Sequence, residues 1–77
     1  MRTIREIAQV IRKDWHPVNF AARPYLDAML HLERVSDRYG MDDARSVLLY
    51  FLSNASSWRG ETARRIKAEL KSIAKGE

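Results

Sequence analysis

The sequence is 77 residues long and contains no cysteine. This absence excludes disulfide bonds, thiolate metal ligands and cysteine nucleophiles together, and it fits a reducing compartment. Long apolar runs are also missing: the longest, Val47–Leu52, has six residues, whereas a membrane-spanning helix needs roughly 20. The first residues lack the apolar stretch of a secretory signal peptide. We therefore expect a cytoplasmic protein that makes no contact with a membrane.

The residue types that enzymes use are scarce or poorly spaced. The glycines, Gly40, Gly60 and Gly76, form no phosphate-binding loop. The histidines, His16 and His31, do not have the spacing of metal ligands, and nothing in the sequence places either of them beside a serine nucleophile. The sequence therefore predicts that the protein is not an enzyme and holds no metal and no cofactor.

What the sequence does have is positive charge. Fourteen lysines and arginines outnumber ten acidic residues, which gives a net charge of +4. The excess lies at the two ends: residues 1–14 carry four basic and two acidic groups, and residues 55–77 carry six and three. Such a charge favours nucleic acid, acidic proteins or anionic surfaces as partners.

The first 15 residues predict an amphipathic helix. Thr3 and Glu6 have the spacing of a capping box, in which each side chain bonds the other residue's backbone amide. Apolar residues then recur at helical spacing along one stripe. Pro17 ends the helix, because the residue before a proline is pushed out of helical geometry.

Three further helices follow. Pro24 suits the first position of the second helix, and either Asp42 or Asp43 can cap the third. With the first helix included, the expected ranges are 3–15, 24–35, 42–54 and 58–75. The expected fold class is therefore all-α: a compact bundle of four helices that forms a single domain over residues 1–77.

The expected core includes residues outside the main helical stripes. Val18 and Phe20, in the linker after the first helix, are expected to pack onto the core. Leu49 and Tyr50 are expected to widen the apolar face of the third helix. We expect Gly40 to take a positive φ in the turn before that helix. A helix-turn-helix motif is not supported, because the gaps between the later helices are too long and the third helix is too apolar.

The fourth helix carries a row of cations. At about 100° per residue, four of them fall within a sector about 80° wide: Arg64, Lys67, Lys71 and Lys75, here called the basic row. Glu61, Arg65 and Glu69 lie on a different sector, spaced for pairing among themselves. The basic row therefore has no acidic partner within its own helix. The alternative interpretation is an ordinary solvated face, in which the last lysines favour the C-terminal end of the helix dipole.

Trp58, with Arg59 beside it, precedes the basic row and has two interpretations. If the fourth helix extends back to residue 58, the indole points away from the core. It then offers an anchor for a protein partner or a stacking surface for a nucleobase. If the chain folds back at the helix entry, Trp58 instead covers the core. Both interpretations stay open at the level of the sequence.

Three segments carry a resemblance to a known family: IREIA…IRKDW, PYLDAML and LLYFLSNASSWRGETARRIKAEL. Together they resemble a small, uncharacterised all-helical family of bacterial, mobile-element and bacteriophage proteins. The resemblance covers nearly the whole chain, and WRGETAR is its most specific piece. Residues 20–24 depart from the more glycine-containing linker of that family. The family has no assigned activity, so the resemblance implies a phage or mobile-element origin and no mechanism.

These observations predict a small binding module, an accessory protein that engages a host protein through Trp58, Arg59 and the basic row. A protein is favoured over nucleic acid as the macromolecular partner. One alternative is sequence-independent nucleic-acid binding through the basic row. Another is a homo-oligomeric structural protein that buries apolar surface of the second or third helix between its copies.

Overall fold

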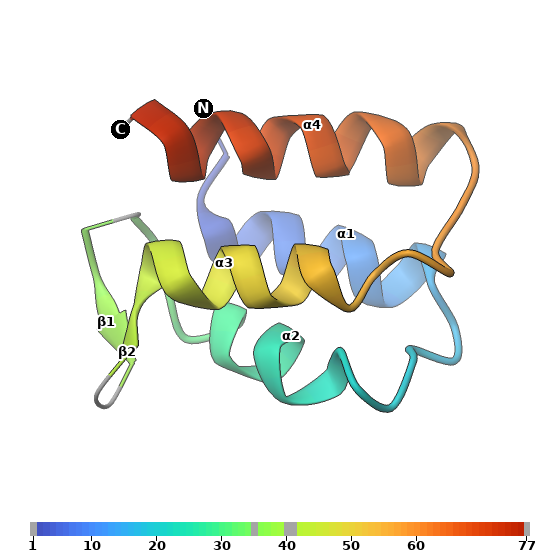
Figure 1. Ribbon diagram of the computed structural model, residues 1–77, viewed down its shortest axis with the longest axis horizontal. Coiled ribbons are helices and arrows are strands. Elements are labelled where there is room, and N and C mark those ends of the chain that lie inside the picture. The colour runs from blue at the N-terminus through green and yellow to red at the C-terminus, as the bar shows by residue number, and fades with distance from the viewer. Residues whose placement is uncertain (1, 35, 40–41, 77) are drawn as a thin grey trace.

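The computed structural model of the chain describes residues 2–34, 36–39 and 42–76. Within these residues it contains four α-helices and one short pair of strands (Figure 1). The elements are α1 (Ile4–Asp14), α2 (Arg23–Met29), β1 (Arg38–Tyr39), β2 (Asp42–Asp43), α3 (Ala44–Ser53) and α4 (Glu61–Gly76). α3 packs against α2 and α4, and α1 packs against the same two helices. The predicted all-α bundle of four helices is confirmed.

α1 begins with the expected capping box. The amide of Glu6 donates to the Thr3 hydroxyl at 3.1 Å, and the Thr3 amide donates to the Glu6 carboxylate at 2.8 Å. Two of the amides that a helix start leaves unpaired are thus satisfied. The helix ends at Asp14, and the Trp15 amide still bonds back to the carbonyl of Ile11. The predicted range of 3–15, caps included, is confirmed.

α2 is shorter than predicted. It ends at Met29 rather than near residue 35, and the next amides bond three residues back in a tight turn. The Asp37 carboxylate then accepts the amides of Glu33 and Arg34, at 2.9 and 3.0 Å. The carbonyl of Glu33 accepts the amide of Ile4 at the start of α1. The backbone groups of Glu33 and Arg34 thus have hydrogen-bond partners that a helix would not provide. Because of these alternative bonds, α2 does not continue through this segment.

α3 is capped by Asp43, whose carboxylate accepts the Ser46 amide at 2.8 Å. Of the two candidate caps, Asp43 is therefore the one used. The residues just before the helix hold an unexpected feature: β1 and β2 pair antiparallel, with Arg38 opposite Asp43. The connection between α2 and α3 is longer than predicted, because α2 ends at Met29 and α3 begins at Ala44. Gly40, for which a positive φ was expected, lies outside the described residues.

The linker between α1 and α2 contributes to the core differently from the expectation. Val18 packs against the core as expected, but Phe20 is 85% exposed, so the prediction that it packs there is wrong. A turn explains the difference, because the Asn19 carbonyl accepts the Ala22 amide and the Asn19 side chain accepts the Ala21 amide. This turn directs Ala22 into the core in place of Phe20.

The apolar face of α3 is narrower than predicted. Leu49 and Tyr50 are 49% and 50% exposed, so neither widens the core. The buried stripe runs through Ala44, Val47, Leu48 and Phe51. Leu49 and Tyr50 flank that stripe. The Tyr50 ring lies 5.4 Å from the ring of Tyr25 in α2, measured between ring centres.

Candidate functional site

Trp58 lies in the loop before α4 and belongs to the core. The helix begins at Glu61, and only 3% of the Trp58 surface is exposed. The indole stacks on Trp15 with the rings 5.7 Å apart and 9° from parallel. It also meets the Phe51 ring edge-on at 6.5 Å. The interpretation of Trp58 as an exposed anchor is wrong, and the interpretation in which it covers the core is confirmed.

Two features hold the loop in this position, a turn at Gly60 and a hydrogen bond to the end of α1. Gly60 has a φ of +112°, which side-chain-bearing residues rarely adopt, and the chain turns there from Trp58 into α4. The Trp58 indole N–H donates to the Asp14 carboxylate at 2.9 Å, so its polar edge is satisfied at the end of α1. A glycine two positions after the tryptophan was the available sequence signal that the helix starts later.

Lys67, a member of the basic row, holds the same loop. Its ammonium donates to the Trp58 carbonyl at 2.6 Å and lies 5.9 Å from the centre of the indole ring. Burial lowers the pKa of Lys67, and the nearby cations Lys71 and Arg59 lower it further. Lys67 therefore already has an intramolecular hydrogen-bond partner, and in this it differs from the other members of the basic row.

The remaining sequence-predicted cations face solvent. Within the part of the chain that the structure describes, none of them makes an ion pair. They are Arg59, Arg64, Lys71 and Lys75, here called the four free cations. Unlike Lys67, they keep their donors available to a partner.

The basic row lies on the α3 side of α4. Glu69, on the far side of the apolar stripe, pairs with Arg2, which precedes α1. The expectation that Glu69 pairs within its own helix is therefore wrong. α4 packs against both α1 and α3. Since Glu69 marks the α1 side, the side of α4 that carries the basic row is the one toward α3.

α3 presents an apolar strip to this side of α4. Arg45 of α3 donates to the Ala74 carbonyl near the end of α4 at 2.7 Å, which identifies the face of α3 that adjoins α4. Leu49 and Leu52 follow Arg45 by four and seven positions and share its face. Leu49 is exposed, and Leu52 is partly buried. We call the surface made by Arg45, these two leucines and the four free cations the α3–α4 flank.

Acidic groups are scarce on this flank. α3 contains no acidic residue, and the acids of α4 are Glu61 and Glu69. Glu69 is on the α1 side, and Glu61 is about a quarter-turn or less from Arg64 and Arg65 without an ion pair to either among the described residues. The flank therefore combines an apolar strip with a cationic border.

Comparisons with protein-family models, curated proteins and solved structures found no match. Among the described residues there is no group of three or more side chains arranged to hold a metal ion. None of the helices in that part of the chain combines the length and the apolarity needed to cross a membrane.

Proposed function

We propose that the protein is a non-enzymatic binding module whose α3–α4 flank binds an acidic, partly apolar segment of a protein partner. The observation that carries the proposal is the exposed side chain of Leu49 on the face of α3 whose Arg45 reaches α4. The four free cations, on the same side of α4, have no ion-pair partner in the described structure. Apolar area at the centre of an interface supplies affinity. Surrounding charges steer the partner and set its orientation. A segment with acidic and apolar residues matches both properties.

A nucleic acid matches the flank less well. Phosphates would neutralise the cations but would leave Leu49 and Leu52 uncovered. The tryptophan that would stack on a base is buried. Sequence-independent nucleic-acid binding is therefore the second candidate. Contact of the four free cations with about four phosphates implies a slope of roughly −3 to −4 for log K against log salt on duplex DNA.

Self-association through the same flank is disfavoured. Two copies would bring like charges together, which opposes binding. A homo-oligomer would have to use another surface, such as the exposed Tyr50 on the α2 side of α3. A molecular mass that stays monomeric across concentrations in analytical ultracentrifugation would agree with the proposal.

The sequence resemblance extends the proposal to the biological setting. It favours an accessory protein of a phage or mobile element that acts in the bacterial cytoplasm. The partner would then be a host protein, whose activity this protein changes by binding to it.

The proposal is tested by crosslinking from the flank itself. A photo-crosslinking amino acid replaces Leu49, and the protein is irradiated in a bacterial lysate. A second protein has the flank charges reversed by Arg64→Glu, Lys71→Glu and Lys75→Glu. A matched control has the same charge change outside the flank, by Lys13→Glu, Arg34→Glu and Arg65→Glu.

We expect a nuclease-resistant protein adduct that the flank reversal removes and the matched control retains. The crosslinked segment should contain acidic and apolar residues. An adduct that nuclease removes would favour the nucleic-acid candidate. An adduct that is equally strong with the reversed flank would contradict the proposed surface, provided that circular dichroism finds all variants folded.

A further inference from the structure

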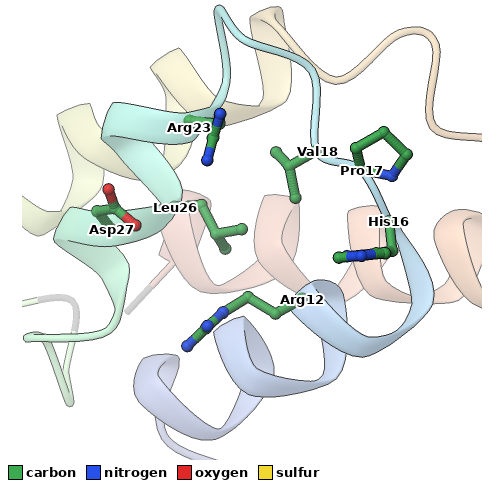
Figure 2. A pocket seen from close by; sticks show the side chains of 7 residues that line it. All are labelled: Arg12, His16, Pro17, Val18, Arg23, Leu26 and Asp27. Carbon is green, nitrogen blue, oxygen red and sulfur yellow. The ribbon is translucent and has the colours of Figure 1, made fainter.

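A pocket of about 300 Å³ lies between the end of α1, the linker after it and α2 (Figure 2). This volume is at the lower end of the range of roughly 300–1,000 Å³ that holds small molecules. Val18, Leu26 and Pro17 give the pocket apolar walls. Leu26 is buried and Val18 packs on the core, so these walls are held by the fold.

Three basic side chains surround the pocket: those of Arg12, His16 and Arg23. Arg12 comes from α1 and Arg23 from α2, and Figure 2 shows them on opposite sides of the pocket, with the His16 ring pointing toward Leu26. None of the three makes an ion pair or a side-chain hydrogen bond with any residue that the structure describes. Arg12 and Arg23 therefore border the pocket from two sides, and neither has an acidic partner among the described residues.

Asp27 is the acidic residue of the pocket wall. It follows Arg23 by four positions on α2, a spacing that allows a helical ion pair, but no such pair is formed among the described residues. Two arginines against one carboxylate leave a net positive charge around the pocket. This excess favours an anionic ligand.

We infer that this pocket binds a small phosphate monoester that carries an apolar or aromatic group. The guanidinium groups of Arg12 and Arg23 bind the phosphate, because their planar sets of donors match its oxygens. His16 supplies a further donor. The apolar group lies against Val18 and Leu26. The pocket shares no residue with the α3–α4 flank, so the inference does not depend on the proposed function.

The test uses phenyl phosphate and inorganic phosphate as probes, followed by amide chemical shifts of the labelled full chain. We expect saturable shifts at Val18, Arg23 and Leu26, with phenyl phosphate binding more tightly because its ring adds contact with the apolar walls. Arg12→Gln and Arg23→Gln should each weaken binding roughly tenfold, as the loss of one charge-assisted hydrogen bond implies. Arg64→Gln, which removes one charge from the flank, is the matched control and should bind like the wild type.

Asp27→Asn provides a test in the opposite direction. Removal of the carboxylate should tighten the binding of phenyl phosphate, an effect that a damaged fold would not produce. Shifts that rise linearly without saturation, or a loss with Arg64→Gln equal to that with Arg12→Gln, would mean general charge screening and would overturn the site. Equal affinities for the two probes would overturn the assigned ligand class, because the apolar walls would then contribute nothing.

Discussion

The indole nitrogen of Trp58 donates a hydrogen bond to the carboxylate of Asp14, 44 positions earlier in the chain, at 2.9 Å. This bond joins the loop before α4 to the end of α1. The same indole stacks on Trp15, the residue that follows Asp14. Trp58 therefore closes this end of the bundle. Its ring face packs on Trp15, and its N–H group has the Asp14 carboxylate as acceptor.

Removal of the Asp14 carboxylate should destabilise the protein through Trp58. We expect Asp14→Ala to lower the free energy of unfolding by about 1–3 kcal/mol, because a largely buried donor loses its partner. In a Trp58→Phe background, which has no such donor, the same change should cost clearly less. Urea unfolding of the four proteins measures this coupling. Equal costs in the two backgrounds would contradict the contribution of the hydrogen bond.

Fluorescence quenching should report the burial of Trp58. The chain has two tryptophans, so Trp15→Phe leaves Trp58 as the single emitter and keeps an aromatic ring against it. We expect acrylamide to quench this emission weakly in the folded protein, because 3% of the residue is exposed. The same protein in urea serves as the reference. Equal quenching in both conditions would place Trp58 at the surface.

Lys67 and Lys71 should respond differently to the same substitution. Lys67→Met keeps most of the aliphatic stem but removes the hydrogen bond to the Trp58 carbonyl. We expect a loss of about 1 kcal/mol in the free energy of unfolding. Lys71→Met removes the same charge from an exposed position, and its effect should stay within about 0.5 kcal/mol. Equal losses measured by urea unfolding would indicate a charge effect rather than a specific bond.

Asp37 should make stability depend on pH in the acid range. The backbone amides of Arg34 and Glu33 bond its carboxylate and lower the pKa below the usual value. The folded state therefore holds the proton less readily than the unfolded state. This stabilisation is complete above the unfolded pKa of about 3.9 and is lost as the pH falls through the folded pKa.

The Asp37→Asn variant tests this pH dependence. The difference in Tm between wild type and variant should be largest near neutral pH and should shrink as the pH falls below about 4. Thermal unfolding followed by circular dichroism at a series of pH values measures it. A difference that stays constant down to pH values where carboxylates are protonated would show that the Asp37 charge contributes nothing.

Features encoded by neighbouring residues were predictable from the sequence. The capping box of Thr3 and Glu6, an aspartate cap on α3 and the helical apolar stripes each depend on residues within a turn or two of one another. The sequence left Asp42 and Asp43 open as that cap, and the structure uses Asp43. The all-α fold and the existence of each helix followed from these local signals. The solvent exposure of Arg64, Lys71 and Lys75 was also implied, because they lie outside the apolar stripe of their own helix.

Other features required contacts between distant segments. The early end of α2 depends on a bond from Ile4 to Glu33 and on the Asp37 carboxylate. The exposure of Phe20 depends on the Asn19 turn. The grouping of Arg12 and Arg23 around one pocket depends on how α1 and α2 pack. Sequence spacing on a single helix contains none of this information.

The sequence by itself determined a basic, cysteine-free bundle of four helices, because caps, periodicity and composition act locally. Only the tertiary structure decided what Trp58 does, because its burial requires a ring from the end of α1, a ring from α3 and the Asp14 carboxylate to meet at one place. It also separated Lys67, which bonds the Trp58 carbonyl, from the three cations that share its helix row. A residue's side of a helix follows from its position, whereas its partner follows from the packing of the whole chain.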